Sequence, residues 1–183
     1  MAGKATTGDF AAVRLLSLDV DGVLTDGGVY YGEDGKVSRK FNVRDGVGIK
    51  RLQATGVEIA VVSAGTTDSI RHRADTLGIR HVFVGAGDKL TTISTLAAGL
   101  GIPMAAVAHV GDDINDLPLL KAVGLPMTVL DAIPEAKAVA RYVTAKKGGE
   151  GAVRDICDRI VAAREKAKYA KPAGKSKARR PRK

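Results

Sequence analysis

The sequence predicts an α/β fold, a Rossmann-like doubly wound parallel sheet with helices on both faces, and three observations support this. Apolar runs of strand length alternate along the chain with amphipathic segments of helix length. Several of the runs are apolar at successive positions, as in strands that are buried on both faces. Glycine follows three of the helical segments, where a left-handed cap would fall. Together these features favour a parallel sheet covered on both sides.

The same patterns place the elements in order. Five apolar runs are expected to form strands, at residues 15–20, 57–62, 82–84, 106–110 and 125–129. Five amphipathic segments are expected to form helices, at residues 45–54, 67–77, 88–100, 113–122 and 133–139. Gly56, Gly78 and Gly101 follow the first three of these helices and would end them.

One segment interrupts the alternation of strands and helices. Residues 28–41 contain Asp34-Gly35 between two flanks of alternating polar and apolar residues. That arrangement is typical of a β-hairpin with a tight turn. We therefore expect a hairpin inserted after the first strand of the sheet.

Composition narrows the class of protein. A chain of 183 residues with 45% apolar residues can form one domain with a sizeable core. No apolar run approaches the roughly 18 to 20 residues that a membrane helix needs. The single cysteine, Cys157, excludes an internal disulfide and a thiolate zinc cluster. A soluble, cytoplasmic protein that does not bind membranes is therefore expected.

The net charge of +9 comes from one end of the chain. Residues 1–163 contain 19 Lys and Arg against 19 Asp and Glu, whereas residues 164–183 contain 10 and 1. We expect a flexible N-terminus at 1–12, a catalytic domain at 13–163 and a basic disordered tail at 164–183. Nucleic-acid binding is expected only as nonspecific contact through that tail.

Polar residues follow the predicted strands at the edge where such sheets bind ligands. Five carboxylates from two distant segments would meet there, those of Asp19, Asp21, Asp112, Asp113 and Asp116. Such a cluster requires a divalent cation to neutralise it, and the small number of oxygen ligands favours Mg²⁺. The sequence therefore predicts a magnesium site at the carboxyl edge of the sheet.

These residue types suit phosphoryl transfer. An aspartate oxygen can attack phosphorus, and a second aspartate two residues along can protonate the leaving oxygen and later deprotonate water. Ser63 could donate a hydrogen bond to the phosphate, and Lys89 could spread its charge. Taken singly, Ser63 could equally be a helix cap and Lys89 a solvated charge, while Asp19-x-Asp21-Gly22 alone could be a turn.

The order of these motifs resembles the haloacid dehalogenase superfamily of phosphotransferases. Asp19-x-Asp21-Gly22 comes first, followed by Ser63, then Lys89, then Gly111-Asp-Asp-x-Asn-Asp116. Segments 21–27, 41–46, 76–79 and 148–154 further resemble a small branch without a cap domain. That branch dephosphorylates 3-deoxy-octulosonate 8-phosphate and nonulosonate 9-phosphates. The resemblance extends over about residues 14–160.

The resemblance implies roles for individual residues. Asp19 would be the nucleophile and Asp21 the general acid and base. Mg²⁺ would be held by Asp19, the backbone carbonyl of Asp21 and Asp112. Residues implied to support the metal ligands are Asp113, Asn115 and Asp116. Residues implied to contact substrate are Asn42, Val43, Arg44, Asp45, Gly46, Lys50 and Arg73.

The resemblance also implies an assembly. The hairpin would take the place of a cap domain, and a homotetramer would form in which a neighbouring subunit closes each active site. Arg44, Lys50 and Arg73 could equally be surface charges. His72, His81 and His109 lack ligand spacing and are expected to be core or surface residues.

Two departures leave the substrate open. Ser63-Ala-Gly65 replaces the Thr-Gly-Arg usual in octulosonate enzymes, and Glu150 replaces an arginine common in them. The favoured function is a magnesium-dependent phosphatase of a sugar-acid phosphate. The alternatives are a phosphatase or phosphomutase of another small metabolite, or a partner module of an acylneuraminate cytidylyltransferase.

Overall fold

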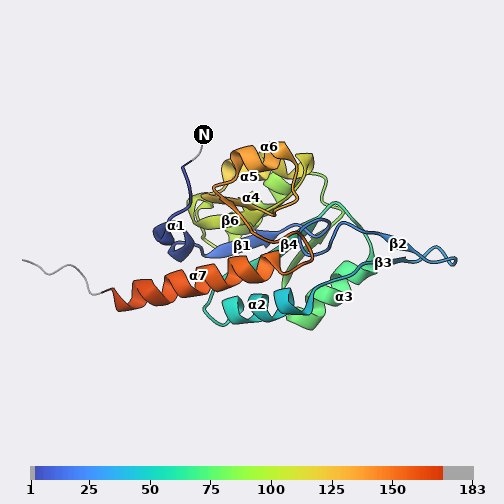
Figure 1. The fold of residues 1–183 in the computed structure, drawn as a ribbon, viewed down its shortest axis with the longest axis horizontal. Coiled ribbons are helices and arrows are strands. Elements are labelled where there is room, and N and C mark those ends of the chain that lie inside the picture. Colours follow the sequence, from blue (N-terminus) through green and yellow to red (C-terminus); the bar gives the residue numbers. More distant parts are fainter. Residues whose placement is uncertain (1–2, 171–183) are drawn as a thin grey trace, which may run out of the picture.

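The computed structural model describes residues 3–170 and contains a six-stranded parallel sheet (Figure 1). Its strand order is β5-β4-β1-β6-β7-β8. Their bounds are β1 (Leu15–Leu18), β4 (Glu58–Ser63), β5 (His81–Val84), β6 (Val107–Val110), β7 (Leu125–Thr128) and β8 (Tyr142–Val143). From β1 the chain runs outward to β4 and β5 and then returns to the other side of β1 as β6. This reversal creates the switch point at which doubly wound sheets bind ligands.

Helices cover both faces of the sheet (Figure 1). On one side lie α2 (Val43–Gln53), α3 (Asp68–Leu77) and α7 (Ala152–Tyr169). On the other lie α4 (Lys89–Gly99), α5 (Leu117–Ala122) and α6 (Pro134–Val139). Two short 3-10 turns, η1 (Met104–Ala106) and η2 (Ile114–Asp116), precede β6 and α5. The expected fold class, a doubly wound parallel sheet with helices on both faces, is confirmed.

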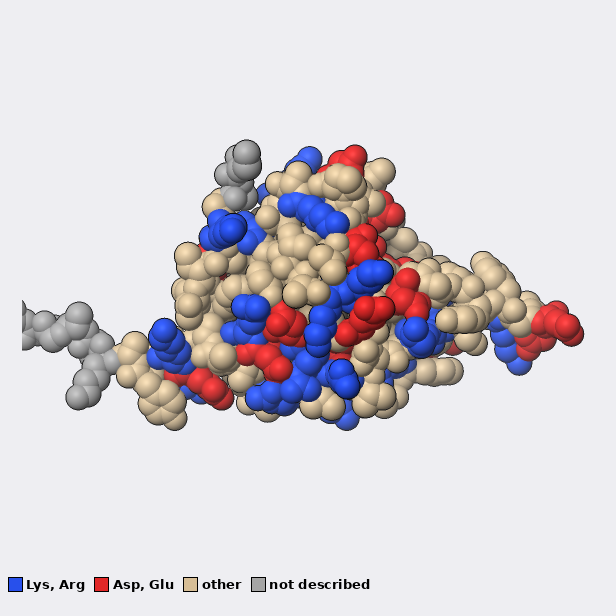
Figure 2. All heavy atoms as spheres, viewed as in Figure 1, with Lys and Arg blue, Asp and Glu red and all other residues tan. Residues whose placement is uncertain are grey.

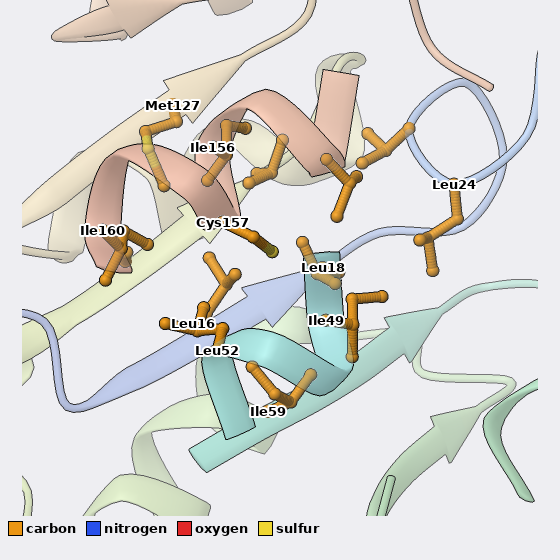
Figure 3. Packing of buried hydrophobic residues seen from close by; sticks show 14 of the residues in the cluster. Leu16, Leu18, Leu24, Ile49, Leu52, Ile59, Met127, Ile156, Cys157 and Ile160 are labelled. Carbon is orange, nitrogen blue, oxygen red and sulfur yellow. The ribbon is translucent and has the colours of Figure 1, made fainter. Parts of the chain in front are cut away.

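The buried residues divide between the two faces because side chains alternate along a strand. Leu16 and Leu18 of β1 join the larger core, which includes residues of α2 and α7 (Figure 3). Leu15 joins the smaller core together with Ile93 and Ala97 of α4. Both faces of the central strands are therefore apolar, which explains the uninterrupted apolar runs in the sequence.

The inserted hairpin comprises β2 (Tyr30–Tyr31) and β3 (Val37–Ser38), paired antiparallel. Gly35 at its turn has φ of +76°, a conformation that glycine adopts without steric cost. The hairpin extends well beyond the rest of the domain (Figure 1). The prediction of a hairpin at 28–41 is confirmed.

The ends of the domain differ from the expected boundaries. Residues predicted to be a flexible N-terminus include helix α1 (Thr7–Ala11), which begins with a Thr6–Asp9 capping box. Phe10 of α1 is buried, and Asp9 pairs with Arg141 at 2.7 Å. A short amphipathic segment of one and a half turns gives little periodicity to detect, so tertiary contacts decide that it is ordered.

The C-terminal helix was not among the predicted elements, and it crosses the expected boundary at residue 163. Helix α7 continues to Tyr169, and its Arg164 donates hydrogen bonds to the carbonyls of Val13 at 2.8 Å and Thr55 at 3.1 Å. Residues 164–169, which were predicted to belong to the tail, are therefore helical. Residues 171–183 of that tail lie outside the described residues. Among residues 3–170, no helix combines the length and apolarity needed to cross a membrane.

Candidate active site

A group of charged side chains lies at the carboxyl ends of β1 and β6, at the switch point of the sheet. One carboxylate oxygen from each of Asp19, Asp112 and Asp116 lies within 4.8 Å of the others. Lys89 Nζ lies 2.9 Å from Asp19 Oδ2 and 2.7 Å from Asp116 Oδ1. The structure thus brings together four of the predicted site residues from segments nearly a hundred residues apart.

Backbone geometry positions Asp19 at the end of β1. Its amide donates to the carbonyl of Val110 at 3.0 Å, which continues the pairing of β1 with β6 past the strand itself. The chain then turns sharply through Gly22, whose φ is +79°. A Cβ on Gly22 would lie 2.0 Å from Asp112 Oδ2, so only glycine allows these two segments to approach this closely.

Lys89 reaches the cluster from the first turn of α4. Asp88 caps that helix by accepting a hydrogen bond from the amide of Thr91 at 3.0 Å. The Lys89 side chain is almost completely buried and ends between two carboxylates. Burial opposes its charge, but the attraction of Asp19 and Asp116 raises the pKa of Lys89 above its ordinary value. The ammonium is therefore held in its charged form.

Asp116 has hydrogen-bond donors for both of its oxygens. Oδ1 accepts from Lys89 and from His109 Nε2 at 3.0 Å, and Oδ2 accepts from the amides of Asp112 and Asp113. Because Asp116 is the acceptor, Nε2 of His109 carries the proton, and Nδ1 accepts from the Ser17 hydroxyl at 3.2 Å. This arrangement makes Asp116 a support for Lys89.

The sequence predicted that His109 would be a core or a surface residue, and in the structure it is a core residue. Its contact with Asp116 was not predicted. His109 lies inside β6, whereas Asp116 ends the η2 turn, so the period of a single helix or strand does not predict their contact. Burial lowers the pKa of His109, so a neutral imidazole donates to Asp116 without adding charge to the cluster.

The carboxylates of the cluster titrate far from their ordinary range. Burial, reinforced by the charge of Asp116, raises the pKa of Asp19 to about 7 against the opposing effect of Lys89. Burial and the charges of Asp116 and Asp113 raise the pKa of Asp112 to about 7. For Asp116, burial acts in the upward direction, but His109 and Lys89 outweigh it and lower the pKa. One lysine therefore does not neutralise this cluster at neutral pH.

Asp21 and Ser63 lie beside the cluster with other partners. Both oxygens of Asp21 accept hydrogen bonds from Arg39, a residue of the hairpin that sequence analysis did not single out. Ser63 is buried at the end of β4, and its Oγ accepts from the amide of Gly65 at 3.0 Å. A hydroxyl that accepts in this way keeps its proton available for a ligand.

Of the five carboxylates expected to meet at this edge of the sheet, three have oxygens within 4.8 Å of one another, those of Asp19, Asp112 and Asp116. Asp21 pairs with Arg39, and Asp113 caps the η2 turn by accepting from the amide of Ile114. Asn115 is exposed on that same turn. The sequence could not separate these residues, because which of several neighbouring carboxylates turn inward depends on the local caps and on partners from distant segments.

The expected substrate-binding segment 42–46 has structural contacts in the single chain. Asn42 caps α2 by accepting from the amide of Arg44 at 2.8 Å, and its Nδ2 donates to the carbonyl of Gly149 at 2.9 Å. Arg73 donates to the carbonyl of Asn42 at 2.9 Å, and a Cβ on Gly46 would lie 2.7 Å from the Arg73 guanidinium. Val43 and Arg44 are exposed.

Lys50 does not lie near the carboxylates. It lines a surface hollow of about 480 Å³ together with Val57 and Glu58, at the amino end of β4. Ser63 lies at the opposite end of that strand. Two turns of helix separate Lys50 from the start of α2, and this distance moves it away from the ligand edge of the sheet.

Asp45 has a different environment from the other members of its segment. Its side chain is buried, and Oδ1 accepts from the amide of Arg154 at 2.7 Å, in the first turn of α7. Its other oxygen, Oδ2, is buried without a hydrogen-bond partner in the described structure. Burial raises the pKa of Asp45 to about 6, although the hydrogen bond from Arg154 and the charges of Lys146 and Arg73 oppose this. Asp45 therefore caps α7 at an electrostatic cost.

Such a fold with such a site is the arrangement of the haloacid dehalogenase superfamily, and comparison with known proteins agrees. A family profile of haloacid dehalogenase-like hydrolases matches residues 81–156. The chain is 44% identical over 156 residues to a 3-deoxy-D-manno-octulosonate 8-phosphate phosphatase of Yersinia pestis, covering 85% of this chain and 83% of that one.

Solved structures show the same likeness. A 3-deoxy-D-manno-octulosonate 8-phosphate phosphatase of Moraxella catarrhalis, in complex with magnesium, phosphate and a KDO molecule, superposes with a TM-score of 0.85. It is 34% identical, over 87% of this chain and 91% of that one. The cobalt-bound enzyme of Haemophilus influenzae gives a TM-score of 0.83 at 35% identity, over 90% and 96% of the two chains.

The chain therefore belongs to the haloacid dehalogenase superfamily, in the branch of the 3-deoxy-D-manno-octulosonate 8-phosphate phosphatases. Membership makes it a phosphatase, an enzyme that hydrolyses phosphoric monoesters.

The capping role of Asp45 predicts a pH-dependent stability. Because the pKa of Asp45 is raised in the folded protein, folding favours the protonated carboxyl, and the free energy of unfolding falls as pH rises through the range from about 4 to 6. Asp45→Asn keeps an acceptor for Arg154 but cannot ionise. Between pH 5 and 7, the free energy of unfolding of the wild type should fall by about 1 kcal/mol relative to that of this variant.

Urea unfolding in EDTA at several pH values measures this difference. Asp75→Asn, at an exposed position of α3, is the matched control. Its free energy of unfolding should change with pH as that of the wild type does. A constant difference between wild type and Asp45→Asn across this pH range would show that Asp45 is not ionising inside the folded domain.

Proposed function

We propose that this phosphatase is Mg²⁺-dependent, acts on a sugar-acid phosphate and proceeds through an aspartyl phosphate on Asp19. The observation that carries the proposal is the buried pairing of Asp19 and Asp116 through Lys89, with Asp112 alongside. The relatives named above favour 3-deoxy-octulosonate 8-phosphate as substrate. A nonulosonate 9-phosphate is the second candidate, favoured by Glu150 and by the lack of an arginine at Gly65.

The residues present fit a divalent cation. Asp112 Oδ1 is buried without a hydrogen-bond partner in the described structure, and hard oxygen ligands of this kind suit Mg²⁺. Asp19, Asp112 and the main-chain carbonyl of Asp21 would hold the ion, whereas Asp116 has donors on both oxygens and would support them. When bound, Mg²⁺ would supply positive charge against the phosphoryl oxygens.

The chain's own residues account for the rest of the reaction. A carboxylate oxygen of Asp19 forms a bond to phosphorus while the bond from phosphorus to the sugar oxygen breaks. Asp21 gives its proton to that leaving oxygen and then takes a proton from the water that attacks the aspartyl phosphate. Release of inorganic phosphate restores Asp19. Lys89 and the Ser63 hydroxyl would bind the phosphoryl oxygens throughout.

Replacing the nucleophile tests this mechanism. Asp19→Asn keeps the shape of the side chain but removes the attacking charge, so we expect phosphate release to fall by about three orders of magnitude or more. In EDTA the variant should be at least as stable as the wild type, because ionised Asp19 is buried at a cost. Asp75→Asn should retain full turnover.

Phosphate release from a panel of 8- and 9-phosphorylated keto sugar acids, with and without Mg²⁺, measures both the effect and the substrate. Activity of Asp19→Asn above about a tenth of the wild-type value would contradict a covalent role for Asp19.

Metal binding should depend on pH. Since the pKa values of Asp19 and Asp112 lie near 7 without metal, protons compete with Mg²⁺ below that pH. We expect the association constant to rise by about tenfold or more per pH unit between 6 and 7 and to level off above 8. Titration calorimetry in two buffers of different ionisation enthalpy would measure affinity and proton release together. An affinity that does not change over this range would exclude these two carboxylates as ligands.

The hairpin supports a tetrameric assembly. It exposes Val29, Tyr30 and Tyr31, and 77% of the surface of Tyr31 is accessible to solvent. Figure 2 shows the hairpin as mostly uncharged surface with charged residues at its tip. An exposed aromatic patch on a projecting hairpin is suited to contact with other copies of the chain. We expect light scattering at micromolar concentration to give the mass of a tetramer, and a monomeric mass would contradict this assembly.

A further inference from the structure

Arg39 links the hairpin to the candidate acid and base. It follows β3, and its side chain is only 5% exposed. Nε donates to Asp21 Oδ1 at 2.6 Å and the adjacent terminal nitrogen donates to Asp21 Oδ2 at 3.0 Å. This is the two-bond fork that a guanidinium forms with a planar carboxylate. The Asp21 side chain is 37% exposed, so solvent reaches this pair from the side of the carboxylate.

The guanidinium also lies against the segment that follows β4. Its other terminal nitrogen donates to the hydroxyl of Thr67. A Cβ on Gly65 would lie 3.0 Å from the Arg39 guanidinium and 3.3 Å from Ser63 Oγ. Arg39 is therefore within the candidate active site, between Asp21 and the hydroxyl expected to bind phosphate. Gly65 leaves the space that the guanidinium occupies.

This pairing conflicts with the chemistry required of Asp21. To act on the leaving group, an oxygen of Asp21 must face it, but both oxygens of Asp21 accept hydrogen bonds from the Arg39 guanidinium. The fork must therefore open for Asp21 to reach the leaving group. Hydrogen bonding to Asp21 raises the pKa of Arg39, so the guanidinium stays charged and needs another anion once Asp21 leaves.

We infer that Arg39 exchanges partners during turnover: it binds Asp21 in the free enzyme and an oxyanion of the substrate in the complex. The inference rests on the proposed role of Asp21 as acid and base. Arg39 uses three of its five N–H groups on partners in the described structure, which leaves two for a ligand. Substrate binding thus frees Asp21 to act as the general acid and base. The oxyanion is the phosphate or a carboxylate of the substrate, groups that share the geometry a guanidinium recognises.

A double-mutant cycle measured by binding tests the exchange without any turnover. Asp21→Asn removes the competing carboxylate, so anions should bind about tenfold more tightly when Arg39 is present. In an Arg39→Gln background the same change should have little effect. Lys40→Gln is the matched control, because it removes the neighbouring positive charge, which pairs with Asp26 at an exposed position. It should leave the effect of Asp21→Asn unchanged.

Three anions identify the group that Arg39 takes: inorganic phosphate, glucose 6-phosphate and 6-phosphogluconate, each titrated in the presence of Mg²⁺. Coupling with all three indicates that Arg39 binds the phosphate. Coupling with 6-phosphogluconate alone indicates that it binds the carboxylate. Equal effects of Asp21→Asn in both backgrounds, or no measurable binding of any of these anions to the Asp21→Asn variant, would overturn the inference.

Kinetics distinguish exchange from simple support of Asp21. If Arg39 binds the substrate, Arg39→Gln should raise KM by about tenfold, whereas a residue that only orients Asp21 would lower kcat with KM unchanged, and that result would also overturn the inference. Arg39→Lys replaces Arg39→Gln if the latter unfolds, since it keeps the charge and loses the fork. Failure of the proposed function is distinguishable from failure of this inference, because the wild type would then show no Mg²⁺-dependent hydrolysis of p-nitrophenyl phosphate.

Discussion

The site depends on one electrostatic arrangement, in which two buried carboxylates and the half-buried Asp112 meet beside a single buried ammonium. Lys89 touches Asp19 and Asp116 at 2.9 and 2.7 Å, and Asp112 lies in the same group. Burial, reinforced by the charge of Asp116, raises the pKa values of Asp19 and Asp112, so the arrangement without metal is short of positive charge. The same shortage makes the site receptive to a divalent cation. The same excess of negative charge therefore both destabilises the ionised cluster and favours the binding of a metal ion.

Close backbone approaches hold this cluster together. Gly22 passes so near Asp112 that no Cβ could be accommodated, and the Gly148 segment packs in turn against Gly22, with a Cβ at 148 falling 1.8 Å from the Gly22 carbonyl oxygen. The turn after β1 is thus clamped between the loop after β6 and the loop before α7. Asp45 accepts a hydrogen bond from the amide of Arg154 in the first turn of α7, and this contact anchors the loop before α7. Ordering of α7 and ordering of the turn after β1 are therefore physically connected.

The hairpin contributes to the site as well as to the surface. Its distal part exposes tyrosines, while its base delivers Arg39 to Asp21 and Thr67. A hairpin that only offered a contact surface would not need a buried guanidinium at its base. The base of the hairpin therefore lies within the candidate site, in direct contact with Asp21.

The sequence by itself determined the fold class, the five main strands, most helices and the hairpin, because these follow from local periodicity and turn chemistry. It also identified Asp19, Lys89, Asp112 and Asp116, since each follows or begins an element at one edge of a parallel sheet. Only the tertiary structure decided which neighbouring carboxylates turn inward, that Lys50 lies at the far end of β4, and that Asp45 caps α7. The contacts of Arg39 and His109 belong to the same class. They join residues that lie far apart in the chain or in different elements, so local patterns contain no signal for them.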